Sequence, residues 1–130
     1  MNPEPLFTAD DLSPEFWNLI AIARRDRDHF HELVKDMERD EMVQFCRDYD
    51  RAASELYAEC FLEHVDPDLS EDDIHDLSFW VVAQGKEHYS HVLDNPEAMP
   101  YQVDSDDPMI RVFGDVVRAY YERFKESLQL

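Results

Sequence analysis

The sequence predicts an all-α fold, a single compact bundle of about five helices formed by one domain over residues 1–130. The chain holds only 2 glycines and lacks the alternating runs of β-branched residues that predict strands. Its apolar residues, 44% of the total, recur mostly at the three- and four-residue spacing of helix faces. That apolar content is too high for a disordered acidic chain, even at a formal net charge of -19.

The first strong helix is expected to begin at Ser13, because serine caps helix N-termini and Pro14 follows where a proline loses no hydrogen bond. Trp17 lies beside the apolar stripe of this helix and is expected in or near the core. A second, shorter helix is expected over residues 26–37, after a break near Asp26.

The longest helix is expected over residues 40–63, where apolar side chains recur at helical spacing without interruption. Pro67 cannot continue a helix, so the pattern stops before it. The only cysteines, Cys46 and Cys60, fall fourteen residues apart on this stretch. That spacing is ~21 Å along a helix, beyond the reach of a disulfide, so we expect two reduced, half-buried thiols.

Two further helices follow in the second half of the chain. Ser70 and Asp73 have the spacing of a capping box, which predicts that one helix begins there. This helix is expected to end before Pro96. Asp107 and the proline after it repeat the start signal, so the last helix is expected over residues 107–128.

Gly85 interrupts the apolar stripe between Trp80 and Tyr89, although a glycine inside a helix costs ~1 kcal/mol relative to alanine. We expect a packing reason, either the close approach of another helix or a bend that turns Trp80 and Tyr89 toward the core. The alternative is a small ligand pocket beside Trp80. Packing is the preferred interpretation, because an isolated mid-helix glycine more often has a packing reason.

The stretch SEDDIHDLSFWVVAQGKEHYSHVLDNPEAM, residues 70–99, contains an acidic pair, a tryptophan and a glycine at fixed spacing: Asp72, Asp73, Trp80 and Gly85. It resembles the signature of the DUF4240 family, small bacterial helical proteins of undefined activity. The resemblance covers about residues 13–100, and FWNLI at residues 16–20 matches the family's opening helix. Ser78 replaces the family's arginine. The resemblance implies a helical fold and no particular chemistry.

The negative charge is concentrated in three stretches. Residues 1–23, 52–85 and 87–110 hold four, nine and six acids and no Lys or Arg, whereas residues 24–51 and 111–130 nearly balance. The segment RRDRDHFHE, residues 24–32, begins the nearly balanced range 24–51. It alternates arginine with aspartate and indicates an ion-paired helix surface. Such a chain repels nucleic acid and anionic membranes and favours cationic partners.

The location of the protein is expected to be cytoplasmic. The chain has no run of ~18 apolar residues that would span a membrane. Its first residues lack the basic region and the apolar stretch of a signal peptide.

An acidic cluster near Trp80 is the strongest candidate for chemistry. Asp72 and Asp76 lie one helical turn apart with His75 between them, and paired carboxylates can act as acid and base in a small enzyme or a ligand-binding site. However, acids in the first turn of a helix stabilise its positive end, and we prefer this interpretation. Because G-x-S-x-G and phosphate-binding glycine loops are missing, we assign no catalytic residue and no cofactor.

His88 and His91 form an H-x-x-H pair on one helix face. Zinc needs further ligands, and no H-E-x-x-H or C-x-x-C motif supplies them. We therefore expect a partly exposed helix surface here and no metal site.

We expect a non-catalytic acidic module that binds a basic protein, in its most specific form a bacterial immunity or antitoxin-like inhibitor of a basic toxin. Complementary charge raises association rates and selects cationic partners. The expected contact residues are Asp66, Asp68, Glu71, Asp72, Asp73, His75 and Asp76. The alternatives are an acidic domain whose charge only keeps it dispersed, and a homodimer built on exposed aromatic side chains of the last helix.

Overall fold

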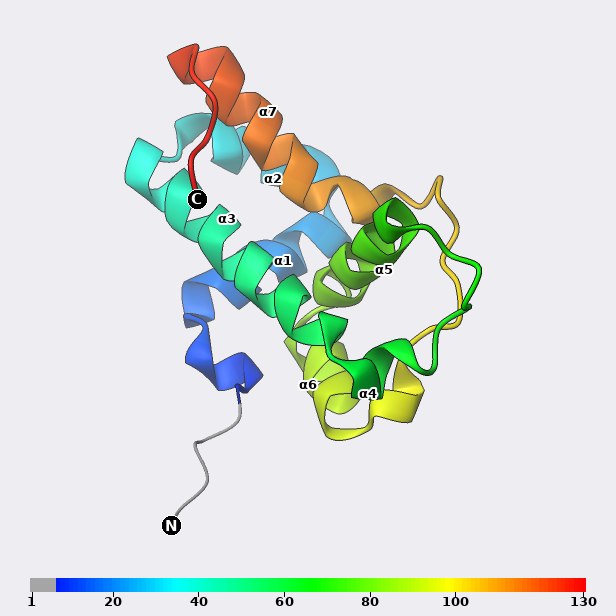
Figure 1. Ribbon diagram of the computed structural model, residues 1–130. Coiled ribbons are helices and arrows are strands. Elements are labelled where there is room, and N and C mark those ends of the chain that lie inside the picture. Colours follow the sequence, from blue (N-terminus) through cyan, green and yellow to red (C-terminus); the bar gives the residue numbers. More distant parts are fainter. Residues whose placement is uncertain (1–6) are drawn as a thin grey trace.

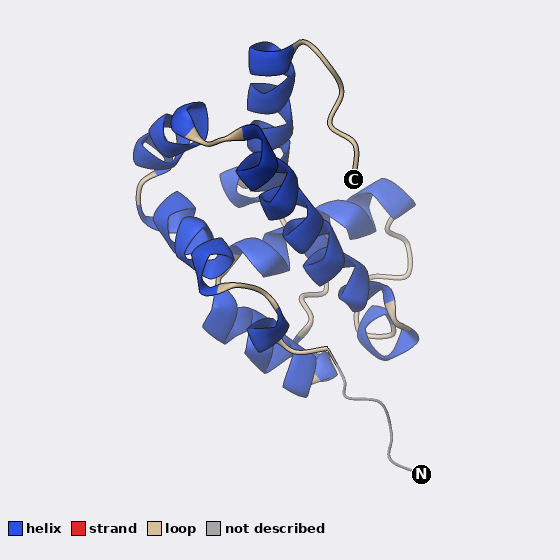
Figure 2. Cartoon of the chain, turned by 90° about the vertical axis from the view of Figure 1, so that its left-hand side faces the viewer, coloured by secondary structure: helices blue, strands red, loops and turns tan. Residues whose placement is uncertain are grey.

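The computed structural model describes residues 7–130 of the chain (Figure 1). These residues form helices joined by turns and contain no strand, which confirms the all-α prediction (Figure 2). The number of helices was predicted too low, because residues 7–130 contain seven α-helices where about five were expected. They are α1 (Pro14–Arg25), α2 (Arg27–Asp36), α3 (Arg39–Ser54), α4 (Glu59–Leu62), α5 (Glu71–Ala83), α6 (Lys86–Asp94) and α7 (Val112–Phe124). Short 3-10 turns are η1 (Ala9–Asp11), η2 (Glu55–Tyr57), η3 (Pro96–Ala98) and η4 (Pro108–Arg111).

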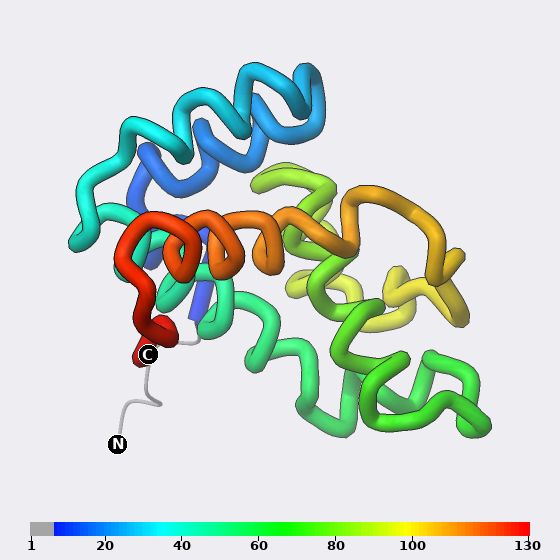
Figure 3. The backbone as a smooth tube through the Cα atoms, turned by 90° about the horizontal axis from the view of Figure 1, so that it is seen from above, coloured from blue at the N-terminus to red at the C-terminus, as the bar shows by residue number. Residues whose placement is uncertain are grey.

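The helices pack in two groups that meet at α3 and α5. In one group α1 lies beside α2, and α7 packs against both α2 and α3 (Figures 1 and 3). In the other group α6 and α4 contact the turn η3 between them, and α6 also contacts α5. None of the helices in residues 7–130 is both long enough and apolar enough to cross a membrane.

Tyr49 of α3 lies at the centre of the core, with 0% of its surface exposed. Its ring is 6.0 Å from that of Phe16 on α1, 5.1 Å from that of Phe79 on α5 and 5.5 Å from that of Phe113 on α7, measured between ring centroids. Its hydroxyl donates a hydrogen bond of 2.7 Å to the main-chain oxygen of Phe79. The one polar atom of this side chain is therefore satisfied where it is buried.

The two tryptophans take different positions relative to the core. Trp17 is buried, its ring lies 5.5 Å from that of Tyr89, and its Nε1 donates to the main-chain oxygen of Ala9 at 2.8 Å. Trp80 is half-buried and its Nε1 donates to Asp107 Oδ2 at 2.9 Å. The indole N–H of Trp17 thus holds η1 against the helices, and that of Trp80 holds the segment just before η4.

The helix starts were predicted from capping residues, and the structure contains the corresponding capping hydrogen bonds. Ser13 Oγ accepts from a main-chain N–H of α1 at 3.2 Å, and Asp26 ends α1 while its carboxylate caps α2 at 3.1 Å. Ser70 and Asp73 form a reciprocal capping box at 3.1 and 3.3 Å. Asp107 caps η4 at 2.9 Å.

The helix predicted over residues 40–63 is divided. Ala58, with φ -63° and ψ 147°, has extended backbone between η2 and α4. The break turns the chain so that Leu56 before it and Phe61 after it are both buried. Apolar spacing therefore continues across a break that periodicity alone does not show.

The helix predicted over residues 107–128 is shorter at both ends, since α7 follows η4 and stops before Lys125. Lys125 adopts the left-handed conformation with φ 55°, and its N–H donates to the main-chain oxygen of Tyr121 at 2.8 Å. The reversal brings Glu126 back to α7, where its Oε1 accepts from the Tyr120 hydroxyl at 2.9 Å.

The two thiols are free, as expected, but the expectation that both are half-buried is wrong. Cys46 is buried in α3, and burial raises the pKa of its thiol to about 12. Cys60 of α4 is exposed.

The expectation of a mid-helix glycine at position 85 is wrong. Helix α5 ends at Ala83, α6 begins at Lys86, and Gly85 between them has φ 105°. A Cβ at Gly85 would lie 3.6 Å from Arg24 Nη1, an ordinary contact, so no other helix backbone approaches closely. Glycine is needed because side-chain-bearing residues rarely adopt this backbone conformation.

We predict that Gly85→Ala lowers the free energy of unfolding by about 1–3 kcal/mol, because alanine is strained at this backbone conformation. The matched control is Gly114→Ala in α7, where a Cβ would meet no atom within 4 Å. That change should raise the free energy of unfolding by about 0.5–1 kcal/mol, since alanine is the better helix former. Denaturant unfolding of both variants measures the difference, and effects of equal sign would contradict this account of Gly85.

Candidate functional site

The predicted acidic residues lie in the turn that leads into α5 and on the first turns of α5 itself. Asp68, Glu71, Asp72, Asp73 and His75 are exposed, whereas Asp66 and Asp76 are half-buried. The region is therefore available to a partner over most of its acidic side chains.

Hydrogen bonds fix this turn against the segment that follows η3. The main-chain N–H of Asp66 donates to the main-chain oxygen of Tyr101 at 3.0 Å. The Asp66 carboxylate accepts from the main-chain N–H of Asp68 at 2.9 Å and from Gln102 Nε2. Together with the capping role of Asp73, these contacts give the turn a defined shape before any partner is present.

The predicted residues of α5 are divided between two hollows. One, of about 600 Å³, is lined by Tyr57, Leu62, Glu71, Asp72, Ile74 and His75, and we call it the acidic groove. The other, of about 230 Å³, includes Asp73 and Asp76 together with Gln102. Asp72 and His75 thus line one hollow, while Asp73 and Asp76 line the other.

The acidic groove combines apolar and acidic side chains. Tyr57 is 38% exposed, and Leu62 and Ile74 are half-buried beside it. Glu71 and Asp72 supply carboxylates on the same hollow. Sequence reasoning missed these three apolar residues as site residues, because their place beside Glu71 and Asp72 depends on which elements lie next to α5 in the fold.

The electrostatic environment of the groove is negative. Burial raises the pKa of the Tyr57 hydroxyl, and the negative charges of Asp50 and Asp76 raise it further. Since both carboxylates act on the phenol in the same direction, a cation placed beside Tyr57 is stabilised by the same charges.

His75 connects the groove to the core. Its ring lies against that of Phe79, with 4.1 Å between the centroids. Phe79 in turn accepts the hydroxyl hydrogen bond of Tyr49. The exposed imidazole of His75 therefore packs on a buried ring of the core.

The other residues singled out in the sequence lie outside the groove. Trp80 does not line it, and its edge faces the ring of His88 at 6.0 Å. Burial, followed by the charges of His91 and Arg24, lowers the pKa of His88, and its Nε2 is buried without a partner among the described residues. His91 is exposed, and no cluster of three side chains that could hold a metal occurs within residues 7–130.

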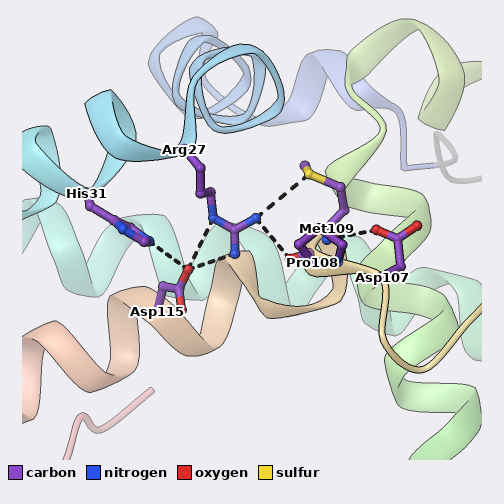
Figure 4. Close-up of polar contacts among 6 residues, drawn as sticks. All are labelled: Arg27, His31, Asp107, Pro108, Met109 and Asp115. Atoms are coloured by element: carbon purple, nitrogen blue, oxygen red, sulfur yellow. Dashed lines mark hydrogen bonds and ion pairs between the residues drawn. The ribbon is translucent and has the colours of Figure 1, made fainter.

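A second polar cluster, not predicted from the sequence, joins α2 to α7 (Figure 4). Asp115 Oδ2 accepts from Arg27 Nη2 at 2.7 Å and from Arg27 Nε at 3.2 Å, and His31 Nε2 lies 2.9 Å from the same oxygen. Arg27 Nη1 also donates to the main-chain oxygen of Pro108 at 2.9 Å. One guanidinium thus holds both α7 and the turn η4 that precedes it.

The carboxylate of Asp115 is stabilised in its charged form. Burial alone would raise its pKa, but the hydrogen bonds from His31 and Arg27 and their positive charges outweigh burial, so the pKa of Asp115 lies below its ordinary value. The side chain is 16% exposed and that of Arg27 is 24% exposed, which shields the pair from solvent. The main role of the Asp115 carboxylate is therefore to link α7 to α2.

Comparison with known proteins assigns a family. The sequence pattern of DUF4240, described as a protein of unknown function, matches residues 13–123. The chain belongs to the DUF4240 family. The match reaches past residue 100 and includes most of α7, so Asp115 lies within the family region. No curated protein and no solved structure matches this DUF4240 chain significantly.

A signal for the α2–α7 link is present in the DUF4240 sequence, although it was missed. Asp115 stands three residues after Val112 and one before Val116, both fully buried. An acid among buried positions of a helix needs a cationic partner, because an unpaired buried carboxylate is costly. The partner itself, 88 residues away at Arg27, follows only from the packing.

We predict that Asp115→Asn lowers the stability of the DUF4240 chain at neutral pH by about 1–3 kcal/mol, because it leaves Arg27 without its anion. The folded pKa of Asp115 lies below the ordinary value of 3.8. Its contribution is therefore present above that ordinary value and is lost as the pH falls through the folded pKa.

Urea unfolding at a series of pH values measures this effect. The stability difference between the native chain and Asp115→Asn should shrink below pH of about 4. Glu122→Gln, an exposed carboxylate on the same helix, serves as the control and should change stability little. A difference that stays constant down to acid pH would contradict the role given to Asp115.

Proposed function

We propose that this DUF4240 protein is a non-catalytic module that binds a basic segment of another protein in the acidic groove. The observation that carries the proposal is the combination of an apolar surface, formed by Tyr57, Leu62 and Ile74, with the carboxylates of Glu71 and Asp72. Lysine and arginine side chains have the matching form, an apolar stem and a cationic end.

The groove can contact each part of such a side chain. The aliphatic stem packs on Leu62 and Ile74, while the charged end reaches Glu71 or Asp72. The exposed face of Tyr57 attracts a cation through its ring, which adds about 0.5–1 kcal/mol at an exposed site. Both kinds of contact favour a basic peptide over a neutral or acidic one.

The distribution of charge in the fold supports the same partner. Residues 52–110 hold fifteen acids and one base, and they include α4, α5 and α6. Residues 24–51 and 111–130, which form α2, most of α3 and α7, hold twelve acids and eleven bases. The excess of acids therefore lies on the helices that build the groove, where it attracts cationic partners over roughly a Debye length of 8–10 Å in physiological salt.

The most specific form of the proposal is a bacterial immunity or antitoxin-like inhibitor. Such a protein would cover cationic residues of a toxin, and a folded toxin would extend beyond the groove. The neighbouring acids Asp66, Asp68, Asp73 and Asp76, with His75 at the groove itself, give a wider acidic surface for that contact.

The alternatives are less well supported by the geometry. Catalysis by the Asp and His cluster is not part of the proposal, because Asp73 lines a different hollow from Asp72 and His75 and its carboxylate accepts the capping hydrogen bond of Ser70. A homodimer built on the last helix would need several exposed aromatic side chains. Tyr121, 56% exposed, is the one largely exposed aromatic side chain of α7, so this alternative has little support.

We predict that Glu71→Gln combined with Asp72→Asn weakens the binding of a fluorescent Lys, Arg and Leu peptide about three- to tenfold. Each exposed ion pair contributes about 0.2–1 kcal/mol, and two are lost. Tyr57→Ala should weaken binding as well, without changing charge. Fluorescence anisotropy at low and physiological salt measures the dissociation constants.

The matched control is Glu32→Gln with Glu122→Gln, which removes two exposed acids on α2 and α7 and gives the same net charge. This control should bind the peptide within about twofold of the native chain. Equal weakening by both double variants, or no effect of Tyr57→Ala, would show that the groove is not the binding site. In cells, affinity capture should recover a basic protein with the native chain and the control, and lose it with the groove variant.

A further inference from the structure

A hollow of about 290 Å³ lies between α2 and α7, away from the acidic groove. The two helices pack against each other, and His31 of α2 faces Asp115 of α7 (Figure 4). The apolar part of its lining is Val34 and Ala119. The polar part is His31, Lys35, Asp115, Arg118, Glu122 and Arg123. In a chain with a net charge of -19, a hollow with more permanent cations than acids is unexpected.

Helical spacing aligns these side chains along the hollow. On α2, His31 and Lys35 are one turn apart, and on α7, Arg118 and Glu122 have the same separation. Residues four apart share one face of a helix, so each helix presents a row of polar groups to the hollow. Ala119 of α7 also lines the hollow, and its small side chain occupies little of the space.

Three of the six ionisable groups at the hollow already have partners. Asp115 is held by Arg27 and His31, which neutralise it. Arg123 Nη1 donates to the main-chain oxygens of Val34 and Met37 at the end of α2. These groups build the walls of the hollow and hold the two helices together.

Lys35 and Arg118 are the two cations of the lining without a partner in the described part of the chain. Neither makes an ion pair or a side-chain hydrogen bond with any residue from 7 to 130. Glu122 also has no such partner, and it is the one carboxylate of the lining not already neutralised. The hollow therefore presents two cations with unused donors, one carboxylate and a small apolar surface.

We propose that this hollow binds the phosphoryl group of a small phosphorylated molecule. A phosphate monoester carries nearly two negative charges and three acceptor oxygens at neutral pH, which match one guanidinium and one ammonium. The apolar surface of Val34 and Ala119 takes the organic part of the molecule. A carboxylate has two acceptor oxygens, one fewer than the phosphoryl group offers to the donors of Lys35 and Arg118.

The size and position of the hollow fit such a ligand. Its volume is close to the lower end of small-molecule pockets, about 300–1,000 Å³, so a compact molecule fits and a large cofactor does not. It lies on the helices whose acids and bases nearly cancel. An anion is therefore repelled less here than at the acidic groove, and this site does not depend on the function proposed for the groove.

The test titrates phenyl phosphate and inorganic phosphate into the full chain at constant ionic strength, followed by backbone amide NMR. Phenyl phosphate should give saturable shifts centred on α2 and α7 and bind more tightly than inorganic phosphate, because its ring reaches Val34 and Ala119. Lys35→Gln with Arg118→Gln should weaken binding at least tenfold. Ala119→Leu, which fills the hollow without changing charge, should weaken it as well.

The matched control is Arg25→Gln with Arg47→Gln, which removes two exposed cations outside the hollow and gives the same net charge. This control should bind phenyl phosphate as the native chain does, and thermal unfolding confirms that each variant is folded. Absence of saturable shifts, or equal weakening by both double variants, would overturn the proposal. Equal binding of benzoate would overturn the assignment to phosphate, and binding only to vesicles with phosphatidic acid would overturn the small-molecule source.

Discussion

The structure depends on the buried position of Tyr49. Its ring is in contact with aromatic rings from α1, α5 and α7, and its hydroxyl is bonded to a main-chain oxygen of α5. Burial raises the pKa of this hydroxyl, so it remains a hydrogen-bond donor. Because the acceptor is Phe79, which also supports His75, the same interaction that centres the core fixes one edge of the acidic groove.

The second half of the chain is positioned by contacts that reach across long sequence distances. Trp80 donates to Asp107 just before η4, and Arg27 donates to Pro108 in η4 and to Asp115 in α7. The segment between η3 and η4 contains no helix. The hydrogen bonds of Trp80 and Arg27 hold its end next to η4. Placing α7 against α2 in this way also creates the hollow between them, since the pairing of Arg27 with Asp115 sets which faces of the two helices meet.

Local physics in the sequence was enough for the helix class and for the helix starts. Ser13 and Ser70 cap helices through bonds to N–H groups three residues away, so no distant residue is needed to predict them. Gly85 shows the limit, because an apolar stripe continues through a positive φ that periodicity does not detect. The acids of the candidate site were found from charge, whereas Tyr57 and the partner of Asp115 depend on packing between elements far apart in sequence.

Because one cysteine is buried and the other exposed, thiol labelling can report how often α3 separates from the rest of the fold. An alkylating reagent reacts with thiolates, so it should modify exposed Cys60 while Cys46, with a pKa of about 12, stays almost wholly protonated and shielded. A second label can enter only when α3 leaves its neighbours. The proportion of doubly labelled molecules over time therefore measures how often this helix is released in the native protein.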